Sequence, residues 1–98
     1  MRILGSFIQT PDEMKRYSIV YSDWLDPEET LSSASYEIDN VTTPPLAITS
    51  LTIADSFATF FVSGGVHQEV YKVVIEVETS DGQIKQDAIM FSIHDFTP

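Results

Sequence analysis

The segment from residue 69 to residue 83 alternates between apolar and polar side chains and ends in a turn signal. It reads Glu69-Val70-Tyr71-Lys72-Val73-Val74-Ile75-Glu76-Val77-Glu78-Thr79-Ser80-Asp81-Gly82-Gln83. Successive side chains of a strand point to opposite faces, so every second residue from Tyr71 to Thr79 would share one face. An Asp-Gly pair is typical of a two-residue type I′ turn, whose central residues need positive φ. The segment therefore predicts a β-hairpin with a second arm over about residues 83–95.

The rest of the chain repeats this pattern in shorter runs separated by turn residues. The runs are Tyr17–Tyr21, Ala34–Ile38, Leu46–Ile53 with a break near Thr49-Ser50, and Phe57–Val62. The last of these is apolar on both faces, so we expect it to be covered on both faces or to contact a partner. Short strands at such spacings are typical of an antiparallel sandwich. The sequence predicts an all-β fold, an immunoglobulin-like antiparallel β-sandwich of six or seven strands.

The N-terminal residues differ from this pattern. Little alternation is present up to Thr10-Pro11-Asp12-Glu13. We therefore expect residues 1–16 to form an extended N-terminal arm, and residues 17–98 to form the immunoglobulin-like β-sandwich domain. The arm could be disordered until it binds a partner.

Composition excludes several classes of function. The chain has 98 residues, 5 Lys plus Arg and 15 Asp plus Glu, for a net charge of −10, and no Cys. A strongly acidic chain is not expected to bind nucleic acid, because neutralising phosphates requires clustered cations. The apolar runs are far shorter than the roughly 20 residues of a transmembrane helix, and the N-terminus lacks the apolar core of a signal peptide. Absence of Cys excludes disulfides and thiolate metal sites.

The chain offers few groups for catalysis or cofactor binding. Only His67 and His94 could act as bases near neutral pH, and no serine lies in a Gly-x-Ser-x-Gly motif. Gly64-Gly65 is followed by neither the Lys nor the helix start of a phosphate-binding loop. We expect no catalytic residues, no cofactor and no small-molecule substrate, and we interpret both histidines as exposed loop or strand-end residues.

An acidic loop is the best candidate for a metal site. Asp23, Asp26, Glu28 and Glu29 supply the oxygen ligands that Ca²⁺ prefers, but without the spacing of a calcium-binding loop. A solvated turn is the alternative, so we predict no metal site and leave calcium binding by this loop as a hypothesis. Within the same loop, Trp24 either closes the end of the sandwich, which we favour, or anchors an interface.

An ordered set of short motifs resembles a family of small tailed-phage virion proteins, the fiber-tail adaptor or tail-associated immunoglobulin-like proteins. The motifs are Pro11-Asp12-Glu13 leading to Tyr17, Tyr21-Ser22-Asp23-Trp24-Leu25, Glu29-Thr30-Leu31-Ser32-Ser33, Phe61-Val62-Ser63-Gly64-Gly65, Tyr71-Lys72-Val73 and Thr79-Ser80-Asp81-Gly82. Together they cover the chain from about Pro11 to Ile93. The resemblance implies a non-enzymatic structural protein of the virion that connects the tail or neck to tail fibers.

The same resemblance implies partners and a location. The partners would be adaptor or tube proteins of the phage tail or neck and a tail fiber protein, with several copies in a symmetric assembly. The protein would lie in the virion, at the tail or neck, after assembly in the host cytoplasm. For the contacts themselves we predict two segments. They supply the candidate partner-binding residues Phe7, Ile8, Pro11, Glu13, Val66, His67 and Gln68.

A different class of function remains open from the sequence. An immunoglobulin-like module could bind carbohydrate or a cell surface through exposed aromatic rings that stack on sugar. The candidates are Tyr17, Tyr21, Tyr36 and Phe61. Absence of binding on a glycan array would rule this alternative out.

Overall fold

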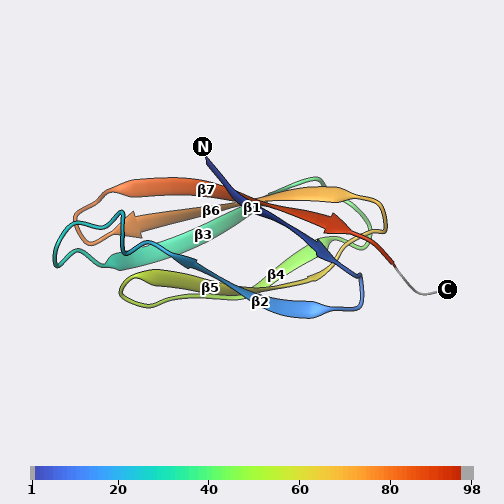
Figure 1. Ribbon diagram of the computed structural model, residues 1–98, viewed down its shortest axis with the longest axis horizontal. Coiled ribbons are helices and arrows are strands. Elements are labelled where there is room, and N and C mark those ends of the chain that lie inside the picture. The colour runs from blue at the N-terminus through green and yellow to red at the C-terminus, as the bar shows by residue number, and fades with distance from the viewer. Residues whose placement is uncertain (1, 96–98) are drawn as a thin grey trace.

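The computed structural model describes residues 2–95, which form two stacked β-sheets (Figure 1). The strands are β1 (Arg2–Gln9), β2 (Met14–Val20), β3 (Leu31–Asp39), β4 (Leu46–Ile53), β5 (Phe57–Gly64), β6 (Val70–Thr79) and β7 (Ile84–Ile93). One sheet has the order β1-β7-β6-β3 and the other β2-β5-β4. The molecule is elongated, with extents of 51 × 20 × 19 Å. The predicted all-β sandwich is confirmed, whereas its immunoglobulin-like character stays a prediction.

The predicted hairpin is formed by β6 and β7, which pair antiparallel from Val70 with Ser92 to Glu78 with Ile84. Its turn differs from the expected type. Gly82 has φ 82° and is the only turn residue with positive φ, while its N–H donates to the Thr79 carbonyl at 3.0 Å. A type I′ turn needs positive φ at two residues. The connection is instead a three-residue loop that ends in a left-handed glycine.

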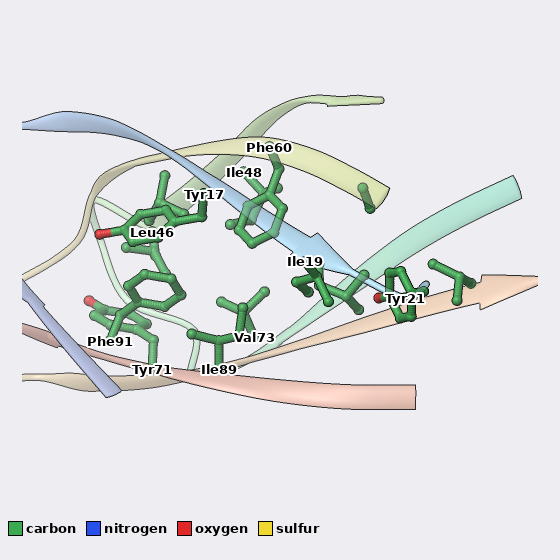
Figure 2. Packing of buried hydrophobic residues seen from close by; sticks show 14 of the residues in the cluster. Tyr17, Ile19, Tyr21, Leu46, Ile48, Phe60, Tyr71, Val73, Ile89 and Phe91 are labelled. Carbon is green, nitrogen blue, oxygen red and sulfur yellow. The ribbon is translucent and has the colours of Figure 1, made fainter. Parts of the chain in front are cut away.

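The core lies between the two sheets (Figure 2). As the alternation predicted, the β6 side chains Tyr71, Val73, Ile75 and Val77 are fully buried. From the opposite sheet, β5 contributes Ala58, Phe60 and Val62, which are also fully buried. Each large apolar side chain buried in this way contributes about 1.5–3 kcal/mol, so burial between the two sheets is a major source of stability for the fold.

The three-stranded sheet confirms one sequence prediction and leaves another open. Pairing between β4 and β5 shifts register between Thr49 and Thr52, where Ser50 has φ 54°, so the expected break in β4 is present. On the outer face of β5, Phe57 is exposed and Phe61 is half-buried. The described chain therefore covers only one face of β5 completely, and contact of the other face with a partner stays a prediction.

The arm expected over residues 1–16 is the main correction to the predicted fold. Residues Arg2–Gln9 form β1, which pairs in parallel with β7, and β2 already starts at Met14. This parallel pair is also an exception to the expected antiparallel sandwich. β1 was not predicted from the sequence because it lies at a sheet edge. Most of its side chains are exposed there, so apolar and polar residues do not alternate along it. No helix among residues 2–95 is long and apolar enough to cross a membrane.

Candidate interaction surface

An apolar groove lies between the edge strands of the two sheets. β1 is an outer strand of one sheet and β2 an outer strand of the other, and residues of both line the groove. The groove has a volume of about 240 Å³ and is lined by Leu4, Phe7, Tyr17, Ser18, Ile19, Val20 and Ile89. We call this face, made of β1 and β2, the β1–β2 side. Exposed apolar surface of this kind is a common feature of protein interfaces.

The charge of the β1–β2 side is opposite to that of the chain as a whole. β1 and β2 carry Arg2, Lys15 and Arg16, which are three of the chain's five Lys and Arg residues, and neither Asp nor Glu. All 15 acidic residues therefore lie elsewhere. The Lys15 ammonium is 5.9 Å from the centre of the Tyr17 ring, which is part of the groove wall. The groove thus has apolar walls, with the Lys15 ammonium near one of them.

A buried glutamine holds the two edge strands together. The Gln9 side-chain amide donates to the Val62 carbonyl at 2.7 Å and to the Glu13 carbonyl at 3.0 Å, and its Oε1 accepts from the Tyr17 hydroxyl at 3.0 Å. Burial, and to a lesser extent the charge of Glu13, raises the pKa of Tyr17. The Tyr17 hydroxyl therefore stays a proton donor at neutral pH, and the groove is built on fixed hydrogen bonds rather than on a flexible arm.

The candidate residues of the N-terminal segment occupy two positions on this side. Phe7 lies in the groove, 40% exposed, with its ring centre 4.9 Å from that of Tyr17. Ile8 is 66% exposed and pairs with Ser92 of β7. Pro11 and Glu13 lie in the β1–β2 turn, where the Glu13 carboxylate accepts from the backbone N–H of Thr10 at 2.9 Å.

The second candidate segment, Val66, His67 and Gln68, forms the loop between β5 and β6. His67 Nδ1 accepts from the backbone N–H of Asp95 at 2.8 Å, and the N–H of His94 donates to the Gln9 carbonyl at 3.0 Å. The residues after β7 thereby join this loop to the end of β1, so both predicted segments lie at the same end of the sandwich (Figure 1). Their partner-binding role stays a prediction.

Part of the acidic loop comes together at the opposite end. The carboxylates of Asp26 and Glu29 lie within 4.8 Å of Asp81, whereas Asp23 and Glu28 are not members of this group. The Glu29 carboxylate accepts hydrogen bonds from the Thr79 hydroxyl, the Asp26 N–H and the Gln83 amide, in that order of effect, and these lower its pKa. These bonds give the cluster a structural role, and calcium binding stays a hypothesis.

Trp24 closes this end of the sandwich, as favoured from the sequence. It packs against the core with its ring centre 6.4 Å from that of Tyr21, and Lys85 Nζ lies 5.4 Å above it. Nearby, Asp87 is buried and contacts Arg2 at 3.4 Å and Lys85 at 3.9 Å. Burial, followed by the charge of Asp87, raises the pKa of Tyr21 to about 12.

The aromatic residues proposed for sugar stacking do not form one exposed surface. Tyr17 and Tyr21 are buried in the core, so the expectation that they are exposed is wrong. Phe61 is half-buried, and only Tyr36 is largely exposed among the four. Alternation along a strand indicates which residues share a face, but it does not indicate which face points into the core.

Comparison with known proteins gives a family and a fold. A family model described as "Podophage GP4 fiber-tail adaptor protein gp77" matches residues 9–92. No curated protein sequence matches the chain. Among solved structures, the chain is similar to the 2,6-sialyltransferase of Photobacterium sp. JT-ISH-224, with a TM-score of 0.52 and 13% identity over 96% of this chain. The match spans 17% of that enzyme, so it supports the sandwich fold alone.

Proposed function

The chain belongs to the podophage fiber-tail adaptor family, and on that premise we propose that it joins tail fibers to the tail of the virion as a non-enzymatic connector. The family itself is one of structural adaptor proteins of the phage tail. The observation that carries the proposal is the match of the family over residues 9–92, which includes β2 to β6 completely, β7 except its last residue, and the last residue of β1.

The geometry supports a connector because two adjoining surfaces are available for contact. One is the apolar, cationic β1–β2 side, which contains Phe7. The other is the end of the sandwich formed by the β1–β2 turn and the loop with His67. A connector present in several copies needs surfaces both for neighbouring copies and for its partners, and loops at the end of a sandwich are common contact sites.

The partners that fit this role are an adaptor or tube protein of the tail or neck and a fiber protein of the same phage. Several copies in a symmetric assembly would match repeated fibers around a tail. Assembly would take place in the host cytoplasm, where absence of Cys makes the chain insensitive to redox conditions. The mature location would be the tail or neck of the virion.

Co-sedimentation of the purified chain tests this proposal. The chain is mixed with tails that lack fibers, with the fiber protein, and with both. We expect it to sediment with tails and to bring the fiber protein down only when all three are present. A fiber protein that sediments equally well without the chain would contradict the connector role. A His67→Ala, Gln68→Ala variant, exposed and outside the core, tests the loop as a contact.

A further inference from the structure

We propose that the β1–β2 side binds the β3 side of a second copy of this chain, in a head-to-tail contact. The proposal rests on the proposed function in one respect, because it assumes that several copies are present at the tail. The β1–β2 side and the β3 side are the surfaces through which those copies would meet. β1 and β3 are the two outer strands of the same four-stranded sheet. No other strand of residues 2–95 pairs with the outer edge of either one.

Charge distinguishes the two edges. Strands β1 and β2 carry three cations and no acid, but Arg2 already contacts the buried Asp87. Lys15 and Arg16 are therefore the cations available on this side, with Glu13 in the adjoining turn. Strand β3 carries Glu37 and Asp39 and neither Lys nor Arg. Both acids of β3 are exposed, and one of them, Asp39, contacts Lys72 at 3.7 Å across solvent-exposed surface. Opposite charge across an interface fixes which patch meets which and suppresses wrong pairings.

The apolar features of the two sides also match. The groove beside β1 is lined by Phe7 and Tyr17, and it lacks an occupant from the described chain. On β3, Tyr36 is 47% exposed and precedes Glu37 directly. An aromatic side chain flanked by an acid is the kind of group that an apolar groove with a cation beside it can accept.

Strand direction is compatible with such a contact. β1 is parallel to β7, while β7 with β6 and β6 with β3 are antiparallel, so β1 and β3 run in the same direction. A neighbouring copy in a similar orientation can therefore place its β3 beside β1 and continue the sheet, because a free strand edge offers unpaired N–H and C=O groups.

A two-fold symmetric contact is disfavoured by the same charges. In a two-fold contact each patch meets the same patch of the other copy, so two β1–β2 sides would bring the Lys15 and Arg16 charges of both copies into one interface. Two β3 edges would do the same for the Glu37 and Asp39 charges. Like charges at these positions destabilise a contact. A head-to-tail contact avoids this repulsion, and it forms a ring where the rotation between successive copies closes.

Charge reversal on the full chain tests the contact, with association measured by sedimentation velocity over a range of concentrations. We expect the wild type to self-associate. Lys15→Glu with Arg16→Glu should weaken association about tenfold or more, as should Glu37→Lys with Asp39→Lys, a change of at least about 1.4 kcal/mol. All four substitutions in one chain should restore it. Asp23→Lys with Asp55→Lys changes the net charge as much as the β3 pair does, in exposed loops, and should leave association unchanged.

Several results would overturn the head-to-tail contact. A chain that stays monomeric at every soluble concentration would do so, even if tails or a fiber protein bind it. Loss of association in the four-substitution chain would point to a contact through one edge only, provided that circular dichroism and melting confirm its fold. Tail binding by a chain that stays monomeric would support the connector role and contradict the head-to-tail contact. Self-association without tail binding would support the head-to-tail contact and contradict the connector role.

Discussion

The Gln9 side chain and the Tyr17 hydroxyl form a buried hydrogen bond of 3.0 Å that joins β1 to β2 across the open side of the sandwich. Gln9 is 1% exposed, and its amide also reaches the Val62 carbonyl on β5. β1 belongs to one sheet, and β2 and β5 belong to the other. This single side chain therefore links the two sheets at the site where the groove forms.

Replacing Gln9 by Ala should reduce the free energy of unfolding by about 1–3 kcal/mol, because a buried hydroxyl and two carbonyl groups lose their partner. The matched control is Gln86→Ala on β7, where the side chain is exposed and contacts Glu76. It should change stability by about 0.5 kcal/mol or less. Urea denaturation of both variants measures the difference, and equal losses would show that Gln9 has no special role.

Two buried tyrosines should respond differently to loss of the hydroxyl. The Tyr71 hydroxyl accepts from the Val66 N–H at 2.8 Å and contacts the Thr42 hydroxyl at 2.7 Å. The buried Tyr21 hydroxyl has no hydrogen-bond partner among residues 2–95. Tyr71→Phe should therefore cost about 1 kcal/mol, whereas Tyr21→Phe should be neutral or stabilising. Thermal melting compares them, and a larger loss in Tyr21→Phe would contradict this assignment.

Two glycines with positive φ differ in the space around them. A Cβ at Gly65 would lie 2.9 Å from Ile93 Cγ1 and 3.2 Å from Tyr71 Cε2, whereas one at Gly82 would meet nothing within 4 Å. Ala at either position carries about 1–2 kcal/mol of backbone strain. Gly65→Ala should be more destabilising, because overpacking adds about 1–3 kcal/mol. Denaturant titration of the two variants gives the difference, and equal values would refute the steric contribution.

Acid should weaken the fold through Glu29. Hydrogen bonds from Thr79, Asp26 and Gln83 lower its pKa in the folded state. The resulting stabilisation is present above the ordinary Glu pKa of about 4.3 and is lost as the pH falls through the lower folded value. The stability difference between wild type and Glu29→Gln should therefore shrink below about pH 4. Denaturation at several pH values tests this. Glu28→Gln controls for the loss of one charge, and a pH-independent difference would contradict the prediction.

The strands with one buried face could be predicted from the sequence, because burial on one side produces the alternation seen in β6 and β7. The type of the β6–β7 turn could not be predicted, because an Asp-Gly pair is compatible with a two-residue and with a three-residue loop. Only the backbone of the structure shows that Gly82 alone takes positive φ in this turn. β1 was missed because an edge strand keeps its outer side chains in solvent and needs no alternation. Its partner, β7, lies at the other end of the chain.

The candidate surface could be predicted only in part. Phe7 and Ile8 were predicted to contact a partner, and that role stays a prediction. The groove depends on β1 and β2 lying on adjacent edges, which no local pattern encodes. Gln9 contacts Val62, which is 53 residues away along the chain, so no local sequence pattern indicates that Gln9 links the two sheets. One signal was available and unused, namely the absence of acidic residues from both β1 and β2 in a chain that has 15 of them.

Cryo-electron microscopy of virions made with and without this chain tests the connector role most directly. We predict density for the sandwich between the tail and each fiber in complete virions, and tails without fibers when the chain is missing, with fibers restored on addition of the purified protein. Fibers attached in the normal position on particles that lack the chain would contradict the account.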